Sequence, residues 1–528
     1  MRKRIVSGVA AVLLVCSCIA VAVSWNGGEP GTQGGSLPPE RDQSSSEANS
    51  PSGRGAVQEP MDAEPRAQGT STWRLRRPAM AGQIEGYADR SSGRSDSRLT
   101  LRVSTSARTF RVVAFRFGAY RGGVAQRVWK SPSVRGQQQR DLVFEPRRTR
   151  TVVAPWKRSL SVRTRGWQPG VYVFKLIASS GWQAHVPYMV RSRSTRGKVA
   201  LVAPTTTWQA YNDWGGYSLY TGPTDDRRSW AVSYDRPYPA PGAKQMLFGV
   251  VPVVTHAEKL DIPLAYLTNT DMAADKGALR GALGYVSMGH DEYWSLPMRH
   301  AALSARNRGT NLAFLGANTM YWRIRLADSR SGPRRKVIGY RSDAALDPFY
   351  DRASPRTTGR YRDYPEAKPE NSLIGMQYEC FPVDSPYRVV SPKWWGFRGT
   401  DVRRGDRFDH LVGIEADRVY PVRSTPRPLQ ILSHVRYNCG GVGTSAQSTY
   451  YTTGSGAGVF TAGTLRWTCA LQTRCNSVSL PPRATAFTRQ VTSNLLRAFS
   501  HGPVAQRHRA HDNVRKFQLP KQNQVPAS

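Results

Sequence analysis

The chain has 528 residues, of which 39% are hydrophobic and 14 are tryptophan, so it can bury a large core and is not a wholly disordered protein. It carries 75 Lys and Arg against 37 Asp and Glu, a formal charge of +38, which raises the question of nucleic-acid binding. Only 13 of the basic residues are Lys and no five basic residues stand in a row, so the excess is dispersed Arg and predicts no specific nucleic-acid partner.

The first 23 residues have the pattern of an export signal or a membrane anchor. Arg2, Lys3 and Arg4 supply positive charge, residues 5–23 are almost wholly apolar, and Ala20-Val-Ala supplies the small residues that a signal peptidase prefers. A cleaved signal and an uncleaved anchor both fit this length. We therefore expect an exported protein, secreted or tethered to the outer face of the membrane. Residues 24–70, rich in Gly, Pro, Ser and Glu, are expected to be a disordered linker.

Residues 71–196 contain short runs in which apolar and polar residues alternate. The clearest runs are 99–104, 110–117 and 171–176, and turns rich in Gly, Ser and Pro separate them. Alternation with period two and frequent turns is typical of an antiparallel β-sandwich. We therefore predict a β-sandwich domain in this region, with much of the Arg on its solvated face.

Residues 197–505 show a different pattern, in which short strands that are apolar throughout alternate with helices. The strands are predicted near 198–204, 263–268, 284–289 and 311–318, and a helix is predicted over 296–309. This alternation favours a parallel sheet covered on both faces. The prediction is thus an α+β two-domain protein, a sandwich followed by an α/β domain, with a polar tail at 506–528.

Four cysteines remain beyond the N-terminal segment, at positions 380, 439, 469 and 475. An even number in an exported chain suggests two disulfide bonds. Cys469 and Cys475 are close enough in sequence to pair, which would leave Cys380 with Cys439, although four cysteines allow three pairings. Their spacing does not fit a zinc site.

Polar side chains follow three of the predicted parallel strands, where ligands gather in such sheets. They are Tyr211 and Asn212 after the first strand, His290, Asp291 and Glu292 after the third, and Asn318 after the fourth. Any one of them could simply pack the rim of the sheet, but several converging polar groups are costly unless they are paired or used. Carboxylate and phenolate oxygens suit a hard cation such as Fe(III), a histidine can act as a base, and an amide can hold a carbonyl oxygen. Signatures of Ser or Cys nucleophiles, of HExxH zinc sites and of nucleotide binding are missing from the sequence.

The same loops resemble a known family. Thr207-Trp-Gln-Ala-Tyr-Asn-Asp-Trp-Gly-Gly, Gly289-His-Asp-Glu-Tyr-Trp-Ser and Phe314-Leu-Gly-Ala-Asn-Thr-Met-Tyr-Trp-Arg are similar to blocks of the large (beta) subunit of N,N-dimethylformamidase. The segments beginning Pro369-Glu-Asn-Ser and Gly463-Thr-Leu-Arg-Trp resemble further blocks, and the similarity extends over about 73–500. The resemblance implies a β-sandwich joined to an α/β domain like that of class I glutamine amidotransferases (flavodoxin-like), without their catalytic cysteine.

The resemblance also implies a mononuclear Fe(III) ion held by two tyrosines and a glutamate, with water as the attacking species. Matched block by block, Glu292 is the expected glutamate ligand and Tyr211 one of the tyrosines. The second tyrosine is expected at Tyr172, because Gly170-Val-Tyr resembles a Gly-x-Tyr strand of the family.

The remaining site residues are assigned in the same way. His290 and Asn318 match the family's catalytic positions, His290 as the base and Asn318 as the group that orients the substrate or the oxyanion. Asp291 and Asn212 are expected beside them, and Glu415 is the best match for a further glutamate that the family uses later in the chain.

The sequence thus predicts an exported, Fe(III)-dependent hydrolase of the C–N bond of a small amide. It departs from the family in its export and in standing alone, since the family's small partner subunit is not evident, and its oligomeric state stays open. The alternative is a non-catalytic envelope or glycan-binding protein on a decayed amidase scaffold. The charge of +38 predicts only loose contact with an anionic cell envelope.

Overall fold

The computed structural model describes residues 67–521, apart from 225–226, 353, 364–366, 473 and 476–477. The expected signal or anchor and all but the last residues of the expected linker lie outside this range. Residues Glu64–Ser528 form one compact unit, a mixed α/β fold in which strands outweigh helices. Among the described residues, no helix has the length and apolar character needed to cross a membrane.

The N-terminal part of the described chain contains two larger β-sheets. A three-stranded antiparallel sheet has the order β1 (Ile84–Ala88), β3 (Arg98–Thr105), β9 (Leu160–Arg163). The second sheet has the order β2 (Ser92–Gly93), β11 (Gln183–Val190), β10 (Gly170–Ala178), β4 (Thr109–Tyr120), β5 (Gly123–Lys130), and β6 (Val134–Arg135) also pairs with β4. A small ribbon follows, formed by β7 (Val143–Phe144) and β8 (Val152–Val153). The three alternating runs of the sequence lie in β3, β4 and β10, which confirms them as strands.

The two sheets share one hydrophobic core. Leu99 and Leu101 of β3 pack in it with Val112 of β4 and with Phe174 and Leu176 of β10. Every second residue of these strands faces this core, as the alternating pattern predicts.

A seven-stranded sheet dominates the rest of the chain. Its order is β14 (Leu264–Thr268), β12 (Val199–Ala203), β15 (Gly284–Ser287), β17 (Asn311–Phe314), β25 (Gly458–Thr461), β24 (Val442–Thr452), β23 (Leu429–Cys439). The first five strands are parallel to one another, whereas β24 and β23 are antiparallel additions. All four strands predicted from the sequence are present at the parallel end.

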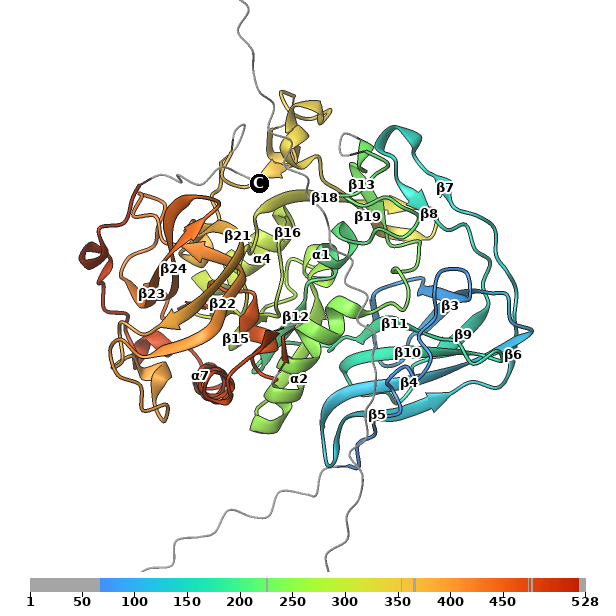
Figure 1. The fold of residues 1–528 in the computed structure, drawn as a ribbon, viewed down its shortest axis with the longest axis horizontal. Coiled ribbons are helices and arrows are strands. Elements are labelled where there is room, and N and C mark those ends of the chain that lie inside the picture. The colour runs from blue at the N-terminus through green and yellow to red at the C-terminus, as the bar shows by residue number, and fades with distance from the viewer. Residues whose placement is uncertain are drawn as a thin grey trace, which may run out of the picture. The chain divides into compact units, whose positions relative to one another are not determined.

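Helices cover both faces of this sheet, as expected for strands that are apolar on both sides. On one face, Val199 and Leu201 of β12 pack in the core formed with α2 (Val251–Ala257) and α7 (Pro482–Ser500). On the other, Ala200 and Val202 pack with α3 (Asn269–Ala274) and α4 (Leu296–Asn307). The helix predicted over 296–309 is α4, and Figure 1 shows α2 and α7 over the same part of the sheet.

Smaller elements surround the strand ends of this sheet. A mixed sheet has the order β13 (Ala231–Ser233), β19 (Gly332–Ile338), β18 (Trp322–Ser329), β16 (Tyr293–Ser295), and β20 (Gly359–Arg360) also pairs with β18. Two antiparallel ribbons are formed by β21 (Gln377–Arg388) with β22 (Arg407–Arg418), and by β26 (Arg474–Cys475) with β27 (Val478–Ser479). Three short helices complete the set: α1 (Thr205–Ala210), α5 (Asn371–Ile374) and α6 (Arg466–Cys469).

Two disulfide bonds are present, Cys380–Cys439 and Cys469–Cys475, which is the pairing favoured by sequence distance. The first links β21 to the end of β23, and the second links α6 to β26. In the chain, the first bond lies between the parallel strands β17 and β25, and the second follows β25.

The segment after residue 506 packs on β23, and so differs from the polar tail that its composition predicts. The amide of Ile431 donates to Asn513 Oδ1 at 2.7 Å, and Asn513 Nδ2 donates back to the Ile431 carbonyl at 3.0 Å. Val514 is buried in the core beneath this contact. These hydrogen bonds hold the segment together with apolar contacts of Val514, Phe517 and Leu519, and composition alone does not show such local contacts.

Candidate functional site

Two tyrosines of one loop lie side by side beyond the end of β12. Tyr211 follows α1 directly, and the amide of Leu219 donates to the Ala210 carbonyl at 3.0 Å, which brings the loop back on itself. Tyr220 therefore stacks on Tyr211, with 4.4 Å between the ring centres. The hydroxyl of Tyr211 lies 2.9 Å from that of Tyr220.

Both phenols meet the carboxylate of Glu292. Tyr211 Oη donates to Glu292 Oε2 at 2.7 Å, and Tyr220 Oη donates to Oε1 at 2.8 Å. The Glu292 amide donates to Thr207 Oγ1 of α1 at 3.0 Å, so the loop after β15 is tied to the loop after β12. Glu292 is only 2% exposed, and four oxygen atoms from three side chains thus meet in a buried place.

His290 and Glu415 stand at the edge of this oxygen cluster. His290 Nε2 lies 3.4 Å from Glu292 Oε2 and 3.4 Å from Glu415 Oε2. Within the described part of the chain, neither His290 Nε2 nor Glu415 Oε2 forms a hydrogen bond, although both atoms are buried. The imidazole side chain as a whole is 23% exposed, so His290 gives the cluster its contact with solvent.

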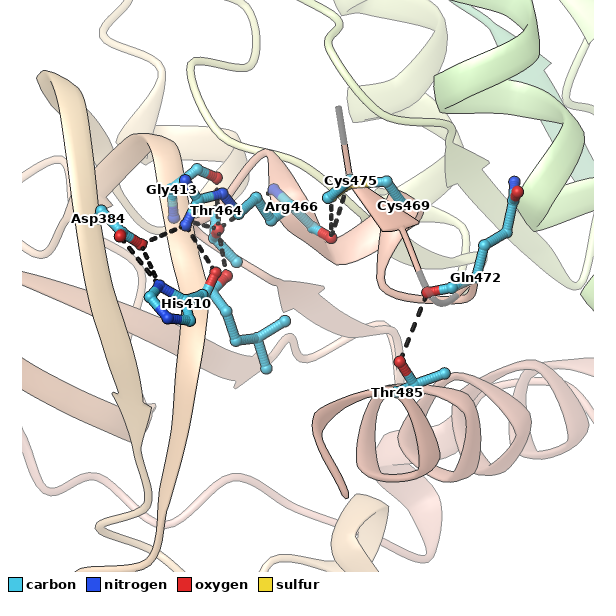
Figure 2. The surroundings of a disulfide bond; sticks show 10 residues. Asp384, His410, Gly413, Thr464, Arg466, Cys469, Gln472, Cys475 and Thr485 are labelled. Carbon is cyan, nitrogen blue, oxygen red and sulfur yellow. Dashed lines mark hydrogen bonds and ion pairs between the residues drawn. A yellow bond between two sulfur atoms is a disulfide. The ribbon is translucent and has the colours of Figure 1, made fainter. Parts of the chain in front are cut away.

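The backbone around Glu415 is held by the block beginning at Gly463 (Figure 2). The Gly413 amide donates to Thr464 Oγ1 at 2.9 Å, and the Leu465 amide donates to the Glu415 carbonyl at 3.4 Å. Arg466 pairs with Asp384 of β21 and donates to the His410 carbonyl of β22, which locks the two strands together. Cys469, three residues after Arg466, is the last residue of α6, and its disulfide bond to Cys475 links the end of this helix to β26.

Asn318 completes the site from the loop after β17. Its backbone is left-handed, with φ of 56°, and its amide donates to Asp417 Oδ1 at 2.8 Å. Because Asp417 and Glu415 are two residues apart on β22, one strand supplies both the site carboxyl and the group that fixes Asn318. The Asn318 Oδ1 atom is buried and has no hydrogen-bond partner among the described residues, so it is available to a ligand.

Burial controls the ionisation of the cluster. It raises the pKa of Tyr211 and Tyr220 well above the usual value, and the charge of Glu292 raises both further. Burial and the charge of Glu292 also raise the pKa of Glu415, whereas hydrogen bonding from Asn318 opposes the rise. Burial lowers the pKa of His290, although Glu292 opposes this shift. The protein alone therefore favours neutral phenols and a neutral imidazole near pH 7, and it favours the protonated form of Glu415 more than water does.

Asp291 and Asn212 lie in the same loops but face away from the oxygen cluster. Asp291 accepts from Ser287 Oγ at 2.7 Å, and burial raises its pKa to about 7. Asn212 Nδ2 donates to Gln209 Oε1 at 3.0 Å and to the Pro237 carbonyl at 2.9 Å. Both side chains support the loops that carry Tyr211 and Glu292.

Tyr172 is not part of this cluster, and the expectation that it joins Tyr211 and Glu292 is overturned. It lies in β10, within the core shared by the two N-terminal sheets. Its hydroxyl donates to the Gln168 carbonyl at 2.6 Å, and its ring stacks on Trp167 at 5.1 Å. A tyrosine on an alternating strand can serve as a core residue, and that is its role here.

Tyr220, rather than Tyr172, lies with Tyr211 and Glu292, and sequence reasoning did not single it out. The available signal was its position in the same aromatic loop, nine residues after Tyr211. Two further groups were also missed, Asp417 and Arg341. The Arg341 guanidinium carbon lies 3.7 Å from the centre of the Tyr220 ring, and its Nη1 donates to the Leu219 carbonyl at 2.6 Å.

The donor set suits a hard cation better than a soft one. Among the residues described, no three His, Cys, Asp or Glu side chains converge so as to hold a metal ion. Two phenols and one carboxylate that share hydrogen bonds at 2.7–2.9 Å offer three oxygen ligands to one position.

We compared the chain with curated proteins and with solved structures. No curated protein matches the chain. Among solved structures, a cycloisomaltooligosaccharide glucanotransferase from Paenibacillus sp., in complex with cycloisomaltoheptaose, is 10% identical, with a TM-score of 0.15, over 40% of this chain and 28% of its own. A likeness at that level carries no argument about fold or function.

The family profile described as N,N-dimethylformamidase beta subunit-like, C-terminal, matches residues 111–478. The matched range is well over half of the 528 residues. It includes every residue of the oxygen cluster, together with His290, Asn318 and Glu415. The chain belongs to the N,N-dimethylformamidase beta subunit-like family.

Proposed function

We propose that the protein is a metal-dependent hydrolase of an amide C–N bond, with Fe(III) as the metal. The observation that carries the proposal is the meeting of Tyr211, Tyr220 and Glu292 in a buried place, with His290 and Asn318 beside them. Family membership supports the amidase class. Tyr220 replaces Tyr172 as the second tyrosine of the proposed ligand set.

The residues present fit such a metal. Tyr211, Tyr220 and Glu292 would hold it, and all three are anionic once the phenols lose their protons. A buried phenol loses its proton only when a nearby positive charge lowers its raised pKa. A cation bound between the two phenols and the carboxylate would supply that charge. The buried Nε2 of His290, Oε2 of Glu415 and Oδ1 of Asn318 lack hydrogen-bond partners in the described chain, which leaves them free for water and substrate.

Each residue around the metal site has a distinct part in the proposed reaction. Bound Fe(III) would supply Lewis acidity, which lowers the pKa of water and polarises a carbonyl. Neutral His290 accepts the proton of the attacking water at Nε2 and passes it to the leaving amine. Asn318 holds the amide group of the substrate through its side chain. Glu415, whose pKa is raised by burial and by the charge of Glu292, lies with Oε2 3.4 Å from His290 Nε2 and can exchange a proton with it.

We further propose that residues 197–505 form a class I glutamine amidotransferase-like, flavodoxin-like domain after a β-sandwich domain at 71–196. The parallel strands support this, since numbering them along the chain gives the order 2-1-3-4-5 that flavodoxin-like sheets have. The residues of the site other than Glu415 follow the carboxyl ends of β12, β15 and β17, where such sheets bind ligands. The two disulfides favour an oxidising compartment and hence export.

The experiment combines turnover with metal content. Purified protein is loaded with ferric iron, and hydrolysis is followed as ammonia release from formamide and acetamide and as dimethylamine release from N,N-dimethylformamide. Glu292→Ala is expected to lose both iron and turnover while its circular dichroism spectrum stays unchanged. His290→Ala is expected to keep iron and lose turnover. Iron binding by Glu292→Ala equal to that of the wild type would refute the ligand set.

The experiment also addresses the non-catalytic alternative. An envelope or glycan-binding protein on a decayed scaffold would bind wall polymer and hydrolyse none of these amides or wall-derived fragments. Binding without turnover by iron-loaded protein would favour that alternative.

A further inference from the structure

One arginine side chain lies over the ring of Tyr220. The guanidinium carbon of Arg341 is 3.7 Å from the centre of this ring. Tyr211 stacks on the same ring, with 4.4 Å between the two ring centres. Both contacts are too short to share one face of a phenol without a steric clash. Tyr220 is therefore held between Tyr211 on one face and Arg341 on the other.

The same arginine also contacts the backbone directly before Tyr220. Arg341 Nη1 donates to the Leu219 carbonyl at 2.6 Å, and the Leu219 amide donates to the Ala210 carbonyl at 3.0 Å. The second of these bonds closes the loop that carries Tyr211 and Tyr220. Arg341 thus fixes both the ring of Tyr220 and the peptide that leads into it.

The backbone of Arg341 is itself held in a strained conformation. Its φ is 59°, in the left-handed region that residues with a side chain rarely adopt. The two preceding residues are tied down, since the Tyr340 amide donates to Thr358 Oγ1 and the Gly339 amide donates to the Trp230 carbonyl, each at 2.9 Å. Strained residues persist where the surroundings fix them, and they are common at functional sites.

The charge of Arg341 is not matched by a carboxylate in contact with it. Within the described part of the chain its contacts are the Leu219 carbonyl and the rings of Tyr220 and Trp322, and its buried Nε has no hydrogen-bond partner. A partly buried cation is costly unless negative charge lies near it. Tyr220 bears that charge when it is a phenolate, and its hydroxyl already meets the carboxylate of Glu292 at 2.8 Å.

We propose that Arg341 is a positioning residue of the metal site that acts through Tyr220, because it holds the ring in place and its positive charge stabilises the phenolate. A cation over the face of an aromatic ring is attracted to it, and the attraction grows when the ring carries negative charge. The proposal rests on the proposed function and adds to it a residue that binds no metal itself. Iron affinity should therefore fall when Arg341 becomes neutral, although every ligand atom is kept.

Three variants of the full chain separate the charge of Arg341 from its other contacts. Arg341→Met removes the charge and keeps a long, unbranched side chain. Arg341→Gln also removes the charge but has an amide that can donate to the Leu219 carbonyl, and it serves as the second neutral variant if Arg341→Met does not fold. Arg341→Lys keeps the charge and loses the planar guanidinium. Circular dichroism and melting temperature of the iron-free proteins establish which variants are folded.

The matched control is Arg77→Met. The guanidinium carbon of Arg77 lies 3.9 Å from the centre of the Trp182 ring, and its Nη1 donates to the Ser180 carbonyl at 3.1 Å. It therefore makes the same two kinds of contact as Arg341, but in the N-terminal part of the chain and outside the oxygen cluster. Its loss is expected to leave iron binding unchanged.

Each protein is titrated with ferric iron against a competing chelator, and its visible spectrum is recorded. Arg341→Met and Arg341→Gln are expected to bind iron about 10–100-fold more weakly than the wild type, the usual effect of losing an outer partner of a metal ligand. Their tyrosinate-to-Fe(III) band is expected at longer wavelength, because a positive charge over the ring lowers the energy of the phenolate electrons. Arg341→Lys is expected to lie between these variants and the wild type in both measurements.

A double variant tests whether Arg341 acts through Tyr220. In the Tyr220→Phe background the remaining tyrosine, Tyr211, still reports iron by its band. Adding Arg341→Met to this background is expected to change iron affinity by less than about twofold, since the partner of the interaction is already gone. A further loss as large as that in the wild-type background would show that Arg341 does not act through Tyr220.

The remaining outcomes also overturn the proposal. Wild-type affinity and band position in both neutral variants would do so while leaving the proposed function intact. Identical affinity and spectra in Arg341→Lys and Arg341→Gln would show that the positive charge has no part. Failure of the proposed function has a different signature, because the wild-type chain would then stay colourless and bind no iron, and the role of Arg341 would fall with it.

Discussion

The change Tyr220→Phe separates the proposed ligand set from the one that sequence alone suggested. It removes one hydroxyl and keeps the ring that stacks on Tyr211 and under Arg341. That hydroxyl makes a 2.8 Å hydrogen bond to the buried carboxylate of Glu292 and a 2.9 Å contact with the Tyr211 hydroxyl. A hydrogen bond to a charged group is worth about 1.5–3 kcal/mol, so metal-free Tyr220→Phe is expected to lose about 2 kcal/mol of unfolding free energy. Loss of a direct ligand should weaken iron binding by more than about 100-fold, since loss of an outer partner alone costs about 10–100-fold.

Thermal unfolding and iron titration are measured side by side with Tyr172→Phe as the matched control. Tyr172 is also a buried tyrosine with a short hydrogen bond, to the Gln168 carbonyl, but it lies in the core shared by the two N-terminal sheets. The control should lose about 1 kcal/mol of unfolding free energy and bind iron as the wild type does. The reverse result, with iron lost from Tyr172→Phe and retained by Tyr220→Phe, would refute the assignment of Tyr220.

Three further predictions concern the frame around the site. Glu258→Gln should cost about 3–5 kcal/mol of unfolding free energy, because Glu258 is the carboxylate partner of buried Arg116 at 2.6 Å; a change below about 1 kcal/mol in denaturant unfolding would contradict it. Burial lowers the pKa of His185 to about 4. Its neutral form therefore contributes about 3 kcal/mol of unfolding free energy, which is fully present above pH 6.5 and is lost as pH falls through about 4. The unfolding free energies at pH 7 and pH 4 should differ less in His185→Gln than in the wild type, and an equal difference would exclude this contribution. Replacing both Cys380 and Cys439 by Ser opens a loop with a sequence separation of 59 and should cost about 4 kcal/mol; a melting temperature equal to that of the wild type would contradict this.

The spacing of apolar residues predicted the strands of the N-terminal sheets and of the parallel sheet well, because each of these strands has one regular burial pattern. Alternating residues in β3 and β10 face one core, and β12 is buried on both sides, so each pattern has a single physical cause. The antiparallel strands β23 and β24 were not predicted. Their sequences mix polar and apolar residues on both faces, because one end of each strand leaves the sheet core.

The sequence predicted those site residues that lie in loops directly after the predicted strands. Tyr211, His290, Glu292 and Asn318 all follow strands of the parallel sheet, so the topology brings them together. Glu415 comes from a ribbon far along the chain, and only its resemblance to the family pointed to it.

Tyr172 shows where the reasoning from pattern fails. A Gly-x-Tyr strand matched the family, but burial on an alternating strand satisfied the same residue without any ligand. Tyr220 could not be chosen over Tyr217 from sequence, because the hydrogen bond from Leu219 to Ala210 decides which tyrosine of the loop meets Tyr211. Such a contact depends on loop closure, which has no periodic signature.

The most direct measurement is the metal content and visible spectrum of the purified wild-type chain after loading with ferric iron. Two tyrosines and a glutamate at one position predict about one iron per chain, with a visible tyrosinate-to-Fe(III) absorption band. Colourless protein without bound iron after the same treatment would contradict the proposed metal centre.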